Sequence, residues 1–287
     1  MLAIVGIVVV AVAVIGGFVW EGGHLLVLFQ PAEFLIIGGA ALGSILISLP
    51  MKVVKELISQ LLAIIKPPPS KQSYMNILLM LYEVFQVARK DGLVALETHI
   101  ERPLESPILQ KYPEFLADHH LVNFFADTMR LIQSGALQSY DLEALIDIDL
   151  ETHHKEKALP PAALARVGDS LPGLGIVAAV LGVVITMGAI GGPPEVIGHK
   201  VGAALVGTFL GILLSYGFVQ PLAANIETIN ASYSQYYTIV KQALLGFHKG
   251  MAPSIAVELA RRSIASDMRP GFVELEEACR GTRDKPQ

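Results

Sequence analysis

Apolar residues are concentrated in four long stretches that contain no Asp, Glu, Lys or Arg. A helix needs about 20 predominantly apolar residues to cross a bilayer. Stretches of this kind cover residues 1–20, 34–51, 170–194 and 201–226. The pattern predicts four transmembrane helices, which are joined by short segments at 21–33 and 195–200 and by a long one at 52–169, with a tail at 227–287.

The basic residues indicate on which side of a membrane these segments lie. All 21 Lys and Arg residues except Lys200 lie in 52–169 or 227–287. Segments next to a membrane that are rich in Lys and Arg stay on its cytoplasmic side. We therefore expect a multi-pass membrane protein whose two termini are both cytoplasmic.

The polar segments have helical periodicity and lack the alternation that is typical of strands. Apolar side chains recur every three or four residues over 77–88, before Arg89, Lys90 and Gly92. Basic residues followed by glycine are typical of a helix end. Further helices are predicted from Leu93 through Glu97, over 113–134, from Ser139, from the fourth span to Leu245, and over 253–262 and 270–280. The expected fold is all-α, with four transmembrane helices and a helical cytoplasmic domain at 52–169.

Two prolines lie at corresponding ends of the third and fourth apolar stretches. Pro172 is expected near the start of the third transmembrane helix, a position where proline is tolerated. Pro221 marks the end of the fourth. Both prolines are therefore predicted on the same side of the membrane.

Common enzymatic motifs are missing from the chain. It has no phosphate-binding loop, no nucleophile elbow and no zinc-protease motif, so neither an enzyme nor a cofactor is expected. Its net charge of -5 does not favour binding to nucleic acid, and the single cysteine, Cys279, excludes an intrachain disulfide. Glu151, His153, His154 and Glu156 resemble a metal-ligand cluster, but this polar stretch is expected to be solvated and no metal site is predicted.

The apolar stretches contain no ionisable side chain that could carry an ion. Proton relays and ion paths in membranes are usually marked by such groups. If this chain helps to conduct ions, the ionisable group must come from another subunit. Thr208, Gly211 and Ser215 share one face of the fourth helix, which is compatible either with close helix packing or with a pore lining.

Charged residues in the cytoplasmic domain are equally open to two interpretations. Arg89 and Lys90 end one predicted helix, and Glu97 lies in the next. Such charges usually form a solvated surface, but they can also orient a partner protein.

Several motifs of the chain resemble a known family. The segment VGDSLPGLGIVAAVLG at 167–182 is joined by VGTFLGILLSYGF at 206–218 and PLA at 221–223. The segments FQPAE at 29–33, IIGGAALG at 36–43 and ELEE at 274–277, and Arg-Pro pairs at 102–103 and 269–270, belong to the same pattern. Together they are similar to the MotA family, the stator subunits of the bacterial flagellar motor in the inner membrane.

The resemblance implies partners and roles for particular residues. Such subunits form a ring of five around two copies of MotB, whose single span supplies an aspartate that carries the ion. It implies that Pro172 and Pro221 couple protonation to movement, and that Thr208 and Ala179 face the aspartate. Arg89 and Glu97 would contact the rotor protein FliG. Alanine rather than threonine at position 179 favours protons over sodium.

Three other classes of protein fit the sequence less well. A relative of ExbB or TolQ would energise outer-membrane processes through the same channel logic, but four spans and the segment from Arg89 to Glu97 count against it. A membrane scaffold would not explain the two prolines. Substrate transport by this chain alone is disfavoured, because the spans offer no ionisable binding residue.

Overall fold

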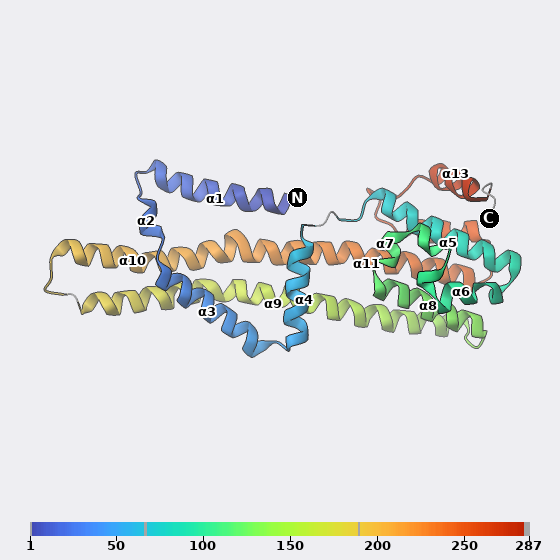
Figure 1. The fold of residues 1–287 in the computed structure, drawn as a ribbon, viewed down its shortest axis with the longest axis horizontal. Coiled ribbons are helices and arrows are strands. Elements are labelled where there is room, and N and C mark those ends of the chain that lie inside the picture. The colour runs from blue at the N-terminus through green and yellow to red at the C-terminus, as the bar shows by residue number, and fades with distance from the viewer. Residues whose placement is uncertain (1, 66–67, 189, 284–287) are drawn as a thin grey trace. The chain divides into compact units, whose positions relative to one another are not determined.

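The computed structural model describes residues 2–65, 68–188 and 190–283, and every regular element within these ranges is helical. Four helical segments are long and apolar enough to cross a membrane: Leu2–Trp20, Leu25–Ser48, Ser139–Met187 and Pro194–His248. The all-α fold with four candidate spans is therefore confirmed (Figure 1). The chain divides into two compact units, and each is described by itself.

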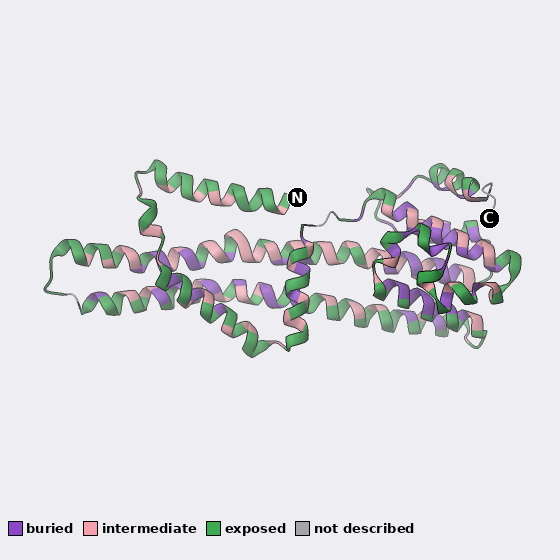
Figure 2. Cartoon of the chain, in the orientation of Figure 1, coloured by how far each residue is buried: buried purple, intermediate pink, exposed green. Residues whose placement is uncertain are grey.

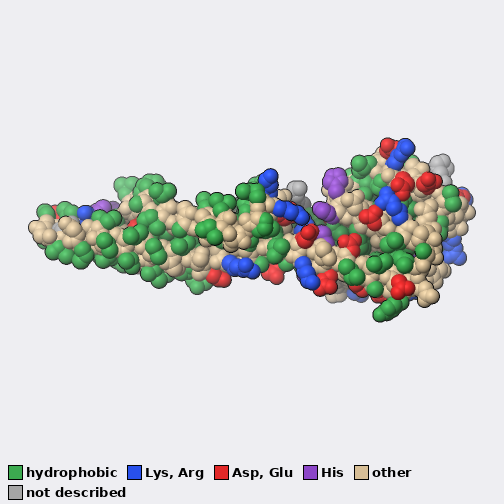
Figure 3. All heavy atoms as spheres, turned by 90° about the horizontal axis from the view of Figure 1, so that it is seen from below, with side chains coloured by type: hydrophobic (Ala, Val, Ile, Leu, Met, Phe, Trp, Pro, Cys, Tyr) green, Lys and Arg blue, Asp and Glu red, His purple; other side chains and the backbone are tan. Residues whose placement is uncertain are grey.

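The first unit comprises Met1–Pro67 and Glu156–Asn230 and contains the candidate spans. Its N-terminal elements are α1 (Leu2–Trp20), α2 (Leu25–Leu28), α3 (Pro31–Ser48) and α4 (Met51–Ala63). It also holds the C-terminal part of α9 (Ser139–Met187), then α10 (Pro194–Ile212), η4 (Leu213–Val219) and the first turns of α11 (Gln220–His248). No residue of α1 is buried within the single chain, and Figure 3 shows hydrophobic side chains covering the visible face of these spans. Such a surface suits contact with lipid or with other transmembrane helices.

The second unit comprises Pro68–Lys155 and Ala231–Gln287. Its elements are α5 (Lys71–Asp91), η1 (Leu93–Leu96), α6 (Glu97–Glu101), η2 (Pro103–Glu105), η3 (Leu109–Lys111), α7 (Pro113–Leu116), α8 (His119–Ser134), α12 (Pro253–Arg262) and α13 (Phe272–Arg283), with parts of α9 and α11. These helices enclose an apolar core in which the rings of Phe85 and Phe247 stack at 4.5 Å (Figure 2). Charged side chains gather on the surface of this unit, as expected for a water-soluble helical domain (Figure 3).

Two helix ends of this unit follow the predicted signals, and one helix does not. Gly92 and Gly135 have φ of 87° and 63°, values that favour glycine, and they end α5 and α8. The single helix predicted over 113–134 is instead two helices, α7 and α8. The break occurs at Asp118, whose Oδ1 accepts hydrogen bonds of 3.1 Å from the backbone N–H groups of His120 and Leu121. This N-cap starts a new helix.

The helix predicted from Ser139 does not stop before the third span. It continues without interruption from Ser139 to Met187 and contains Pro160, Pro161 and Pro172 in its interior. The expectation that Pro172 lies near a helix start is therefore wrong. Each proline removes one backbone hydrogen bond, and in membrane proteins neighbouring helices and side chains offset this loss.

Candidate functional site

The core of the first unit is a contact between the backbones of α9 and α10. A Cβ atom added to Gly211 would lie 2.5 Å from the carbonyl oxygen of Leu171 and 2.8 Å from Cα of Gly175. A Cβ added to Gly175 would lie 2.7 Å from the carbonyl oxygen of Gly207. Only glycine permits this approach, which is how transmembrane helices associate where no hydrophobic force draws them together.

Two further glycines of α9 make similar close contacts, one with α10 and one with the start of α11. A Cβ on Gly182 would lie 2.7 Å from Cβ of Ala204, and a Cβ on Gly168 would lie 2.8 Å from Cγ of Gln220. Gly168, Gly175 and Gly182 follow one another at intervals of seven residues. This spacing is visible in the sequence, but close packing was considered only for the face of Thr208, Gly211 and Ser215 on the fourth helix.

Thr208 and Ala179 lie at the same level of the helix pair. Gly207, which precedes Thr208, would place a Cβ 3.1 Å from the backbone nitrogen of Ala179. The side chains of Thr208 and Ala179 are both half-buried in the single chain, so part of each remains accessible to another subunit. The structure thus brings together two residues that are distant in sequence and were assigned to one site by resemblance.

The polar face predicted on the fourth helix is divided by this contact. Gly211 is turned towards α9, and Ser215 is fully buried, with an Oγ atom that has no hydrogen-bond partner among the described residues. Thr186 is also fully buried, and its Oγ1 donates to the carbonyl oxygen of Gly182 at 2.8 Å. Of the three residues on that face, Thr208 is the one that remains partly exposed. Close packing therefore accounts for Gly211 and Ser215.

The two prolines lie near a hydrogen bond that joins α9 to α11. Nε2 of Gln220 donates to Oδ1 of Asp169 at 2.7 Å. Pro221 follows Gln220 directly and is exposed, whereas Pro172 is half-buried one helical turn after Asp169. The Asp169–Gln220 hydrogen bond was not predicted, because its partners are 51 positions apart.

The backbone before Pro221 is not an ordinary α-helix. Leu213–Val219 forms a π-helix, η4, which ends one residue before Gln220–Pro221. Proline has no N–H group, and its ring clashes with the carbonyl of the fourth preceding residue, so the helix cannot keep its regular pattern there. Wide turns of this kind are rare and often occur at functional sites.

Glu33 is a buried carboxylate in the first turn of α3, a helix of a candidate span. It was assigned to the segment at 21–33, but α3 begins at Pro31, so Glu33 lies in its first turn and is only 7% exposed. The predicted apolar stretch at 34–51 leaves out this carboxylate, because the helix that carries the stretch begins three residues earlier. The sequence signal was the pattern Pro-x-Glu, which is typical of a helix start and places acidic residues in the first turn.

Arg89 lines a cleft of 740 Å³ in the second unit. The cleft is formed by α5, α12 and α13, with Lys90, Ile255, Phe272 and Arg280 among its lining residues. Arg280 is paired with Glu276 at 2.7 Å, whereas no ion pair of Arg89 or Lys90 is found among the described residues. The cleft thus offers cations beside apolar surface.

Two other titratable groups of this cleft are held by the chain itself. Glu258 accepts bonds from Arg261 and Arg262, and the hydrogen bond from Arg261 holds the pKa of this carboxyl below its usual range. Cys279 is buried, which raises the pKa of its thiol to about 12. A neutral, buried thiol is structural rather than reactive.

Glu97 begins α6 and is exposed, but it does not line the cleft that contains Arg89. The turn between them contains Gly92 and η1. The two charges assigned to rotor binding therefore lie on the surface of the same unit without sharing a pocket.

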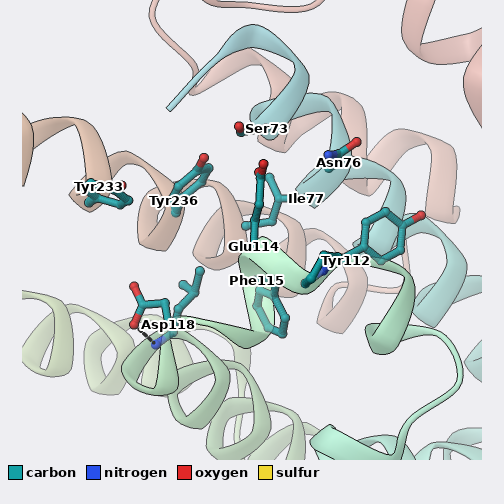
Figure 4. Close-up of a pocket in the computed structure, with 11 residues that line it drawn as sticks. Ser73, Asn76, Ile77, Tyr112, Glu114, Phe115, Asp118, Tyr233 and Tyr236 are labelled. Atoms are coloured by element: carbon teal, nitrogen blue, oxygen red, sulfur yellow. Dashed lines mark hydrogen bonds between the residues drawn. The ribbon is translucent and has the colours of Figure 1, made fainter. Parts of the chain in front are cut away.

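A smaller cavity of 110 Å³ in the second unit contains none of the predicted site residues. Figure 4 shows Tyr236 and Tyr233 on one side of it and Glu114 and Asp118 on others. The dashed line in this view marks the N-cap hydrogen bond from the backbone N–H of Leu121 to Oδ1 of Asp118. Oδ1 of Asp118 is therefore already engaged in capping α8.

The metal-like cluster is less solvated than expected at one position. His153 is half-buried, and its ring lies 4.4 Å from that of Tyr237 and 5.9 Å from that of His120. Within the described ranges, no three His, Cys, Asp or Glu side chains are arranged to hold a metal ion.

Models of two protein families match the chain. Residues 4–92 match the motility protein A N-terminal family, and residues 117–238 match the MotA/TolQ/ExbB proton channel family. The second match contains the α9–α10 contact.

Full-length relatives give the same assignment. Motility protein A of Salmonella typhimurium is 43% identical over 288 residues, covering 100% of this chain and 98% of the relative. Motility protein A of Escherichia coli is also 43% identical over 288 residues, with the same shares of both chains. Chemotaxis protein LafT of Vibrio parahaemolyticus is 38% identical over 272 residues, covering 94% of this chain and 95% of the relative.

Solved structures share the fold. The C. jejuni MotAB structure superposes with a TM-score of 0.76 at 20% identity, covering 92% of this chain and 96% of that one. The flagellar MotAB stator complex of Bacillus subtilis gives a TM-score of 0.74 at 21% identity, covering 94% of this chain and 98% of that one. The chain is thus a multi-pass protein of the inner membrane that belongs to the MotA family of flagellar motor stator proteins, within the MotA/TolQ/ExbB proton channels.

Proposed function

We propose that copies of this chain surround a MotB-like partner. Protons cross the membrane along a path that is lined by Thr208 and Ala179 of this chain and by an aspartate of the partner. The observation that carries this proposal is the level shared by Thr208 and Ala179 on the α9–α10 pair. The side chains of both are half-buried rather than enclosed, as contact with a further helix requires. The relatives' own names and structures concern motility and MotAB complexes, which supports the same partner.

Proton flow supplies the energy for the movement. Each charge that crosses releases roughly 2.3 kcal/mol per 100 mV of membrane potential. Protonation of the partner's aspartate removes a charge from a narrow interface and changes which packing of the two subunits is preferred. Movement then follows as a switch between discrete arrangements. The Asp169–Gln220 hydrogen bond and the wide turn η4 lie beside the two prolines, where such a switch would reach the cytoplasmic side.

Rotation of tethered cells tests this proposal. Cells that lack their own stator receive this chain with its cognate partner, and the proton and sodium gradients are collapsed separately. We expect rotation to stop only when the proton gradient is lost, because the small apolar side chain of Ala179 offers no oxygen ligand for sodium. Rotation that follows sodium would keep the motor function and refute the proton assignment.

A variant at Ala179 tests the location of the path in the same cells. Ala179→Asp places a fixed negative charge beside the partner's aspartate and is expected to stop rotation. Ala179→Asn, which has nearly the same shape without the charge, should retain part of the speed. Normal rotation of Ala179→Asp cells would show that the α9 span does not line the path.

We also propose that the cleft at Arg89 and the exposed Glu97 contact the rotor protein FliG. Cations without a partner beside apolar side chains suit an acidic surface with an apolar anchor. Five copies of the chain would present five such surfaces to the rotor, with both termini in the cytoplasm.

Charge reversal tests this contact. Arg89→Glu should reduce motility severalfold by weakening and misorienting the encounter with the rotor. Lys155→Glu, at an exposed cation that does not line the cleft, is the control and should swim normally, because the exposed ion pair of Lys155 with Glu151 adds little stability. The measurement is the expansion rate of colonies in soft agar at equal membrane levels of each variant. Restoration of Arg89→Glu by an opposite reversal in the rotor protein would establish direct contact, and equal losses in both variants would contradict it.

A further inference from the structure

One carboxylate oxygen of Glu33, Oε2, is buried without a hydrogen-bond partner among the described residues. Glu33 as a whole is 7% exposed, and its Oε2 atom accepts no hydrogen bond from any described residue. The backbone of Glu33 is satisfied, since its N–H donates to the carbonyl of Gln30 at 3.1 Å. The missing hydrogen bond therefore concerns an oxygen of the side chain and not the backbone N–H group.

Oε2 of Glu33 points at the contact between α9 and α10. A Cβ added to Gly207 would lie 2.5 Å from this oxygen, 3.1 Å from the backbone nitrogen of Ala179 and 3.2 Å from Cβ of Ala178. Glu33 thus fills the space that a side chain at position 207 would occupy. Its carboxylate lies at the level of Ala179 and next to the residue that precedes Thr208.

The surroundings offer Oε2 no charge of the opposite sign. No ion pair of Glu33 is found among the described residues, and the parts of α2, α9 and α10 that pack here carry apolar side chains and glycine. The titratable residues of α10 are Glu195, His199 and Lys200, in its first two turns. Lys200 lies seven positions before Gly207, about two helical turns away on the same face.

An ionised carboxylate without a partner is costly in a membrane, and intramembrane carboxylates usually mark ion pathways. A bound proton removes the charge and resolves this cost. From this position we propose that Glu33 is a second proton-binding site, which takes protons from the periplasmic side and releases them at the level of Ala179 and Thr208. In this step an O–H bond forms at the carboxylate as a hydronium ion gives up its proton, and the same bond breaks as a water molecule or carboxylate accepts it. The inference rests on the proposed proton path.

The test compares Glu33→Gln with Glu33→Asp and with Glu21→Gln. Glutamine keeps the shape and cannot be ionised, aspartate keeps the acid, and Glu21 is an exposed acid between α1 and α2. Rotation is measured at high and low load over a range of external pH. We expect Glu33→Gln to retain the torque at high load, where proton supply does not limit the motor. At low load it should lose speed several-fold, and the loss should increase as external pH rises. Glu33→Asp should retain most of the low-load speed, and Glu21→Gln all of it.

Infrared difference spectra after a pH jump give a second readout that is independent of rotation. Membranes containing the complex of this chain with its partner should show a carboxylic acid band that Glu33→Gln removes and Glu21→Gln leaves in place. Wild-type rotation on a proton gradient tests the proposed path, whereas the difference between variants and wild type tests Glu33. Equal losses for Glu33→Gln and Glu33→Asp at all loads and pH values would show a packing role only and refute the proposal. An unchanged carboxylic acid band in Glu33→Gln would do the same.

Discussion

Replacing Gly211 by valine is expected to abolish motility and to lower the amount of the protein in the membrane. A Cβ at position 211 would lie 2.5 Å from a carbonyl oxygen and 2.8 Å from a Cα atom of α9, so backbone rather than a flexible side chain is in the way. Overpacking of a filled interior typically costs 1–3 kcal/mol, and a clash with backbone on two sides should reach about 3 kcal/mol. Thermal unfolding of the protein in detergent and soft-agar motility measure the two effects.

Gly202→Val is the matched control for this variant. Gly202 is on the same helix, α10, and a Cβ there meets no atom within 4 Å. We expect this protein to accumulate at the wild-type level and to unfold at nearly the wild-type temperature. If Gly211→Val accumulated and unfolded like Gly202→Val, α9 and α10 would not be in backbone contact.

Replacing Pro221 by alanine is expected to stop rotation while leaving the protein folded. The new N–H group can bond to the carbonyl of Gly217, which allows the π-helix Leu213–Val219 to relax to an α-helix. The side chains on either side of the relaxed turn would then change their relative orientation, which alters the face presented to the partner. Circular dichroism and membrane level check the fold, and tethered-cell rotation checks the function.

Pro194→Ala controls for the loss of a proline as such. Pro194 is exposed at the first position of α10, where its missing N–H would have no partner in any case. Rotation should therefore continue at normal speed. Normal rotation of Pro221→Ala as well would mean that η4 is not part of the moving element.

The sequence predicted those features of the fold that depend on local patterns. Four charge-free stretches located the spanning helices, and Gly92 and Gly135 ended α5 and α8 as expected. Local signals also led to two wrong predictions. Asp118 is a good N-cap, but it lies inside a continuous apolar period that predicts one uninterrupted helix over 113–134. Pro172 was placed near a helix start because propensity disfavours proline elsewhere, and the interior of α9 overrides that preference.

The candidate site was predictable in part, and mostly through resemblance. Thr208 and Ala179 came from matching motifs, and their shared level depends on the path of α9 and α10, which no single-residue property reveals. Glu33 was missed because its charge excluded it from the apolar stretch that defined the span. Its burial depends on Gly207, far along the chain, whose missing side chain makes room for the carboxylate.

The three glycines of α9 that follow one another every seventh residue have a mechanical consequence. Most packed helices interlock, because ridges of side chains on one helix fill the grooves between side chains on the other. Along this stripe, Gly175 and Gly182 place no side chain between α9 and α10, and Gly168 places none between α9 and the start of α11. A small displacement along the helix axis therefore disturbs fewer side-chain contacts on this stripe than it would between interlocked helices. We expect this close but smooth contact to let α9 and α10 slide slightly past each other while they stay packed.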